Sequence, residues 1–371
     1  MKGSKIILND GRLFSRIYVH VFKNPLIGMR PQTRSSRRRF LKGTAAGAGA
    51  FAFGGLSVGT AAAQEAIVDV GEVGTEISRT TTDEWDHVTF SDPFTQTLSD
   101  LGENAIVTMK PPSYRGIQPV HIRLRNVDQE GFDYQLEEWD YQDEVHRHEK
   151  IFWVALAPVI AEIPTASGAA FSVRAGEQPV DTSGTSVNFG LGTFDSRPVV
   201  IPQAQTYNGK ADSIITRLNG GVEKTGFNMF VQEQEANQDY HRTEEGGYIA
   251  VEVPRFGSLV DTDGTVMTEF EARRPTRPIQ DSPSEDARIP FVINDNDGFG
   301  SNPRVVTAMQ TRSGPQPANL RRTELTRDHM ELFVDEEQSA DSETAHVRED
   351  AGFLAFGSNA LLNGEDVQVT V

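Results

Sequence analysis

The stretch GFDYQLEEWDYQDEVHRHEKIFW at residues 131–153 occurs again as GFNMFVQEQEANQDYHRTEEGGY at residues 226–248, and the two align without a gap. A third copy follows with two extra residues in an acidic loop. The motif His-x-x-Glu-x-x-x-aromatic thus occurs three times, which indicates an internal repeat. The matched pairs are His146 and Glu149, His241 and Glu244, and His346 and Glu349.

Each copy contains short runs in which apolar and polar residues alternate, as at 120–124 and 132–136. This period of two predicts β-strands, and Asn208-Gly209 between such runs is typical of a turn. About 100 residues per copy suits a small β-domain. We therefore expect an all-β chain of three tandem antiparallel β-sandwiches. Their expected bounds are 64–158, 159–254 and 255–371, after a non-globular N-terminal segment at 1–63.

The composition restricts the chemistry of the protein. The chain of 371 residues has no Cys, which excludes disulfides, thiolate metal sites and thiol nucleophiles. It has 53 acidic and 35 basic side chains; residues 1–63 hold 11 of the bases and one acid, which leaves 24 bases against 52 acids. Such a surface repels nucleic acid, so none is expected as a partner. The acidity favours a secreted protein of halophilic type, because salt screens self-repulsion.

Residues 1–63 resemble a twin-arginine export signal. Arg37, Arg38 and Arg39 precede Phe40 and Leu41, and an uncharged stretch at 43–63 ends in Ala61-Ala62-Ala63. We expect export, an extracellular or cell-surface location and no membrane span in the mature chain. Retention of the segment as an anchor and a start at Met29 stay open alternatives.

The first copy resembles the H-type lectin domain, a six-stranded sandwich. The likeness lies in VTFSDPF at 88–94, IRLRNV at 122–127, Gly131-Phe132, Trp139, and WVAL at 153–156. It implies a shallow site for glycans or polysaccharide, in which Arg123 and Trp139 contact the sugar and Asp140 stands where the family has His. Arg217 and Arg321 are the corresponding arginines, with Gln234 and Glu337 at the position of Trp139. Because the family forms trimers, the resemblance also implies an intramolecular pseudo-trimer or a homo-oligomer.

The repeated His and Glu allow two interpretations. They are either a metal or acid–base pair, or a structural pair in which His bonds an acid across a hairpin and Glu orders a turn. Residues i and i+3 of a strand face opposite sides, which favours the structural interpretation. No cofactor is expected, although the turns at 261–264 and 295–298 resemble fragments of calcium loops.

These observations predict an exported, non-enzymatic carbohydrate-binding protein. The alternative is a structural or adhesive cell-surface protein whose sandwiches serve as protomers or spacers. A hydrolase is disfavoured because no constellation of nucleophile and base recurs.

Overall fold

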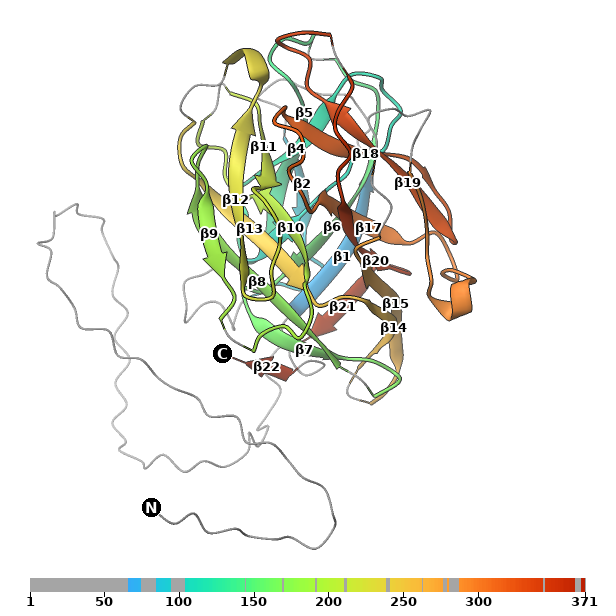
Figure 1. Ribbon diagram of the computed structural model, residues 1–371. Helices are drawn as coiled ribbons and strands as arrows, with labels where there is room; N and C mark the ends of the chain where they lie inside the picture. Colours follow the sequence, from blue (N-terminus) through green and yellow to red (C-terminus); the bar gives the residue numbers. More distant parts are fainter. Residues whose placement is uncertain are drawn as a thin grey trace, which may run out of the picture. The chain divides into compact units, whose positions relative to one another are not determined.

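The predicted all-β fold is confirmed in a computed structural model, whose described residues form many strands and hardly any helix (Figure 1). Two short 3-10 helices, η1 (Glu235–Asn237) and η2 (Asn294–Asn296), interrupt the strands. The described residues all belong to one compact unit, Thr60–Val371. The structure describes residues 66–74, 85–94, 104–143, 145–168, 170–190, 192–209, 212–237, 241–261, 263–275, 279, 287–342, 344–363 and 368–370.

Three small antiparallel sheets repeat one strand order. In each, the central strand pairs with a short strand on one side and a longer strand on the other. In the first two sheets the central strand begins at the repeated Gly-Phe pair. The first sheet is β2 (Asp86–Thr89), β5 (Gly131–Glu138), β4 (Val120–Arg125); the second is β9 (Thr185–Asn188), β12 (Gly226–Glu233), β11 (Ile214–Leu218); the third is β16 (Ala287–Pro290), β19 (His329–Glu336), β18 (Ala318–Leu325).

Three larger antiparallel sheets also share one order, with a fifth strand in the second. The first is β21 (Ala360–Asn363), β1 (Ala66–Gly74), β6 (Lys150–Leu156), β3 (Ile106–Thr108). The second is β22 (Gln368–Thr370), β7 (Ile160–Pro164), β8 (Ala170–Val180), β13 (Glu244–Val251), β10 (Val199–Ala204). The third is β14 (Arg255–Val260), β15 (Val266–Arg273), β20 (Ala351–Phe356), β17 (Arg304–Met309). We call β1–β6 the first set, β7–β13 the second and β14–β20 the third.

One strand of each larger sheet directly follows the last strand of the preceding set along the chain. Strand β7 follows β6 and pairs with β8, and β14 follows β13 and pairs with β15. At the end of the chain, β21 follows β20 and pairs with β1, so the third set closes on the first. The expected boundaries at 158 and 254 fall between β6 and β7 and between β13 and β14. Strand pairing therefore crosses them.

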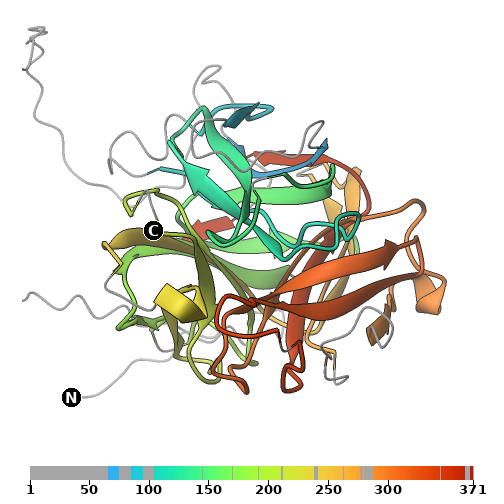
Figure 2. The ribbon, with the colours of Figure 1, turned by 90° about the horizontal axis from the view of Figure 1, so that it is seen from above.

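Strands β6, β13 and β20 of the larger sheets are buried along nearly their whole length. In β20, Phe353 and Ala355 pack in the core of the third sandwich, whereas Leu354 and Phe356 join a different cluster. That second cluster contains side chains of all three sets, including Ile249 of β13. Figure 2 shows the strands of the three sets arranged around one centre. Burial on both faces explains why these strands read as continuous apolar runs instead of alternating ones.

We predict that ring closure by β21 stabilises the whole unit. Leu362 of β21 is fully buried in the shared central cluster, so Leu362→Ala should lower the free energy of unfolding by about 2–5 kcal/mol. Leu361, which is only partly buried, supplies the control Leu361→Ala with a smaller loss. Urea unfolding monitored by tryptophan fluorescence measures both. A Leu362→Ala protein as stable as the control would contradict the role of closure.

Candidate functional site

The three arginines assigned to sugar binding lie in the interior. Arg123, Arg217 and Arg321 are 1%, 3% and 0% exposed. They occupy equivalent places on β4, β11 and β18, where each faces the central strand of its own small sheet. The shallow site that the lectin resemblance implies is therefore not formed by these side chains.

Each arginine forms an ion pair with the repeated glutamate of another set. Arg123 Nη2 lies 3.2 Å from Glu244, and Arg217 Nη2 lies 3.0 Å from Glu349. Arg321 Nη2 completes the cycle at 2.8 Å from Glu149. The first set thus binds the second, the second binds the third, and the third binds the first.

The repeated glutamate also orders a loop within its own set. The Glu149 carboxylate accepts hydrogen bonds from the Ser113 hydroxyl and from the backbone N–H groups of Arg115 and Gly116. Glu244 and Glu349 accept the same kinds of bond, a hydroxyl and two backbone N–H groups each. Their donors are Thr206, Asn208 and Gly209 for Glu244, and Thr311, Ser313 and Gly314 for Glu349.

The repeated histidine bridges two carboxylates. His146 Nδ1 lies 3.2 Å from Glu138 and its Nε2 lies 3.0 Å from Glu149. His and Glu converge because His146 lies in the loop before β6 and not in a strand. The other bridges are Glu233–His241–Glu244 and Glu336–His346–Glu349, with distances of 3.0–3.2 Å.

The charges of this network shift its pKa values. Burial lowers the pKa of His146, whereas its hydrogen bonds to Glu138 and Glu149 raise it. The hydrogen bonds outweigh burial, so the pKa lies above the ordinary value of histidine. His346 follows the same pattern. Burial also raises the pKa of Glu349, but bonds from His346 and other donors and the Arg217 charge bring it down to about 2. A protonated imidazole between carboxylates is the state that these contacts favour.

A glycine lies under each histidine ring. A Cβ atom added to Gly116, Gly209 or Gly314 would lie 2.3, 2.2 or 2.7 Å from the imidazole of its set. The pattern Ser/Thr-x-x-Gly therefore belongs to the same network as His-x-x-Glu. It occurs at 113–116, 206–209 and 311–314, and this recurrence is the sequence signal that could have identified the loop.

Trp139 and Asp140 lie in different surroundings. Trp139 is 1% exposed and its ring packs 4.7 Å from the His121 ring, so no face is open to a sugar. Its counterparts Gln234 and Glu337 are buried as well. Asp140 is exposed and accepts a 2.7 Å hydrogen bond from the Ser213 hydroxyl of the second set.

Two groups in the described part of the chain bring three potential metal ligands within 4.8 Å of one another: Asp212, Glu233 and His241, and Glu324, His329 and Glu331. Both ring nitrogens of His241 form hydrogen bonds to carboxylates, those of Glu233 and Glu244. These hydrogen bonds account for the grouping around His241 without a metal. In the turn considered for calcium at 261–264, Asp261 accepts backbone N–H bonds from Asp263 and Thr265. In the turn at 295–298, the Asn294 side chain donates to the Gly298 carbonyl.

An open cleft of about 490 Å³ lies where the third set meets the first. Four of the side chains that line it are basic, Arg115, Lys150, Arg304 and Arg322, and one is acidic, Glu324. The Arg322 guanidinium lies 4.6 Å from the centre of the Phe152 ring and donates to the Lys150 carbonyl. Positive charge is thus concentrated in this cleft of an acidic protein. The sequence did not predict the cleft, because the residues that line it come from distant segments of the chain.

The comparisons with known proteins give one relative. The chain is 28% identical over 291 residues to Halomucin of Haloquadratum walsbyi. The match covers 71% of this chain and 3% of Halomucin. No family model matches the chain, and no solved structure matches it significantly. In the described part of the chain, no helix has the length and apolar character needed to cross a membrane. The signal residues Arg37, Arg38, Arg39, Phe40 and Leu41 lie outside the described residues.

We predict that Gly209→Ala destabilises the protein by about 3 kcal/mol. The new methyl group displaces the His241 ring and weakens its buried hydrogen bonds to charged groups. The matched control is Gly221→Ala, at an exposed position with no atom closer than 3.9 Å to the added Cβ. Urea unfolding measures both variants, and equal stability of the two would contradict the packing argument.

The His–Glu network also predicts a pH dependence. The raised pKa of His346 stabilises the fold fully below about pH 6.5, and this contribution is lost as pH rises through the folded-state pKa. The lowered pKa of Glu349 stabilises it above about pH 4.5, and this contribution is lost as pH falls towards about 2. His346→Gln should therefore cost more stability at pH 6 than at pH 9. Urea unfolding at constant salt tests this, and an equal cost at both pH values would contradict it.

Proposed function

We propose that this chain is an exported, non-enzymatic extracellular protein that binds acidic polysaccharide, meaning glycans bearing carboxylate or sulfate groups. The observation that supports this proposal is the basic cleft between the third and first sets. Beyond residue 63 the chain has 24 basic and 52 acidic side chains, so four bases around one cleft stand out from the rest. The sugar site proposed here is therefore the basic cleft, and not the buried arginines that the lectin resemblance implied.

The cleft offers the contacts that an acidic sugar requires. A guanidinium can hold a carboxylate or sulfate through two parallel N–H bonds. Arg322 is only 4% exposed and donates to the Lys150 carbonyl, so it contributes its charge from the wall of the cleft. Arg304 is partly exposed and donates to the Asn359 side chain at 2.8 Å. These restraints reduce the side-chain entropy lost on binding. The exposed Arg115 adds a third guanidinium at the rim.

High salt favours such short contacts over long-range attraction. The Debye length falls to about 3 Å at 1 M salt, so distant charges contribute little to affinity. Direct, bidentate pairs inside a cleft are screened less. Modest affinity per site would be raised by avidity if several copies act together on one polymer.

The similarity to Halomucin supports a location outside the cell. Because the matched part is 3% of Halomucin, the activity of that whole protein does not transfer to this chain. The export signal expected at 37–41 is consistent with the same location. The absence of catalysis is supported by the placement of the His–Glu pairs, which are buried and have both ring nitrogens facing carboxylates.

A second candidate is a structural or adhesive role without sugar binding. The observation that favours it is the closed ring, in which β21 pairs with β1 and three buried ion pairs join the sets. Such a closed, internally paired ring is suited to serve as a protomer or spacer. The same binding experiment separates the two candidates.

We predict that the protein binds uronate-bearing and sulfated polysaccharides in preference to neutral ones, measured on a glycan array and by calorimetry in 2 M salt. The double variant Arg115→Met, Arg304→Met should lose about tenfold or more in affinity, because charge-assisted bonds contribute about 1.5–3 kcal/mol each. Arg242→Met, at an exposed arginine that does not line the cleft, is the control. Equal binding by both variants would exclude the cleft, and no binding by the wild type would favour the structural role.

A further inference from the structure

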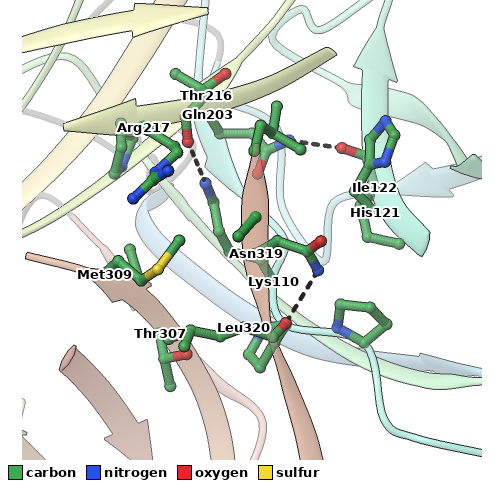
Figure 3. Close-up of a pocket in the computed structure, with 16 residues that line it drawn as sticks. Lys110, His121, Ile122, Gln203, Thr216, Arg217, Thr307, Met309, Asn319 and Leu320 are labelled. Atoms are coloured by element: carbon green, nitrogen blue, oxygen red, sulfur yellow. Dashed lines mark hydrogen bonds between the residues drawn. The ribbon is translucent and has the colours of Figure 1, made fainter. Parts of the chain in front are cut away.

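A small pocket lies where segments of all three sets meet (Figure 3). It is lined by the chain around Lys110, by β10 and β17 of the larger sheets, and by β4, β11 and β18 of the small sheets. The pocket has about 50 Å³ of space. At roughly 10–15 Å³ per water, this holds about three to five water-sized species.

The described residues that line the pocket carry positive charge and no carboxylate. Lys110, Arg217 and His121 all contribute to its wall. Lys110 donates to the Thr216 carbonyl at 3.4 Å, which is long for such a bond, and its ammonium has three protons to donate. Arg217 already pairs with Glu349, and His121 with Glu137. Among the described residues, Lys110 has no ion-pair partner, so its charge is the one left to be balanced.

Of three equivalent positions in the repeat, one in each set, only the position of Lys110 carries a charged side chain. It lies six residues before Gly116, and the corresponding positions before Gly209 and Gly314 are Gln203 and Ala308. All three line the same pocket. The site is therefore one site for the whole unit, although the fold around it is repeated.

Several buried polar atoms of this wall have no hydrogen-bond partner within the described part of the chain. Some of these atoms are donors and others are acceptors. They are His121 Nδ1, Gln203 Oε1, Arg217 Nε, Thr307 Oγ1 and Asn319 Oδ1. Leaving such an atom unsatisfied costs about 1–3 kcal/mol. Their gathering around one pocket indicates a polar occupant.

We propose that this pocket binds one small halide anion, chloride in a saline medium, at the Lys110 ammonium, together with water. A halide fits the space and balances the charge, whereas a sugar requires several times that volume. The amide oxygens of Gln203 and Asn319 cannot contact an anion directly, so water molecules link them to it. This site is independent of the basic cleft.

The environment of the lysine supports the same conclusion. Burial lowers the pKa of Lys110 to about 7. An adjacent anion favours the charged form of the ammonium and so offsets the cost of burial. Bound halide and a charged Lys110 therefore stabilise each other.

Crystals of the protein grown in sodium bromide test the proposal by anomalous scattering. A bromide peak within contact distance of Lys110 Nζ is expected in the wild type and in Lys224→Met, which removes an exposed lysine outside the pocket. The peak should be absent in Lys110→Met. Water alone in the wild-type pocket, or a peak that persists in Lys110→Met, would overturn the assignment.

Thermal unfolding gives an independent measurement on the same proteins. The melting temperature is compared in sodium chloride and in sodium gluconate of equal ionic strength, since gluconate is too large for the pocket. Replacing gluconate by chloride should raise the melting temperature of the wild type and of Lys224→Met more than that of Lys110→Met. An equal gain in all three would overturn the proposal, and a wild type with no gain would do so even if Lys110→Met fails to fold.

Discussion

The structure depends on a cycle of buried ion pairs between arginine and glutamate. Arg123, Arg217 and Arg321 each cross from one set of strands to the repeated glutamate of another, at 2.8–3.2 Å. Charges in a protein interior are costly unless each is paired and hydrogen-bonded. The glutamates meet this requirement with backbone N–H groups, a hydroxyl and a histidine, so the same carboxylate orders its own loop and holds the next sandwich.

This arrangement explains why three sandwiches form one unit. Their larger sheets share a central apolar cluster, and β7 and β14, which follow the last strands of the first and second sets, pair within the next larger sheet. Strand β21 then closes the ring on β1. Strand pairing therefore joins the third set to the first, and an isolated β-bridge joins the second to the third.

Part of the site could be predicted from the sequence. The repeat identified the His and Glu residues, since identical spacing in three copies marks residues under one structural constraint. The resemblance to a lectin implied that Arg123, Arg217 and Arg321 contact a sugar, whereas the structure places all three in the interior. Whether Arg123 faces a ligand or Glu244 depends on how the second set packs on the first, and no local pattern records that packing. The basic cleft and the pocket around Lys110 join residues from different copies, so they were not predicted.

The sequence by itself determined the all-β class and the threefold repetition, because alternation of apolar residues and turn chemistry are local properties that the chain carries in every copy. The tertiary structure alone decided which residues are buried between sets, which strands close the ring and where positive charge gathers. Those outcomes depend on distances between residues as far apart as Arg321 and Glu149. Such distances are fixed by packing of whole sheets and not by neighbours along the chain.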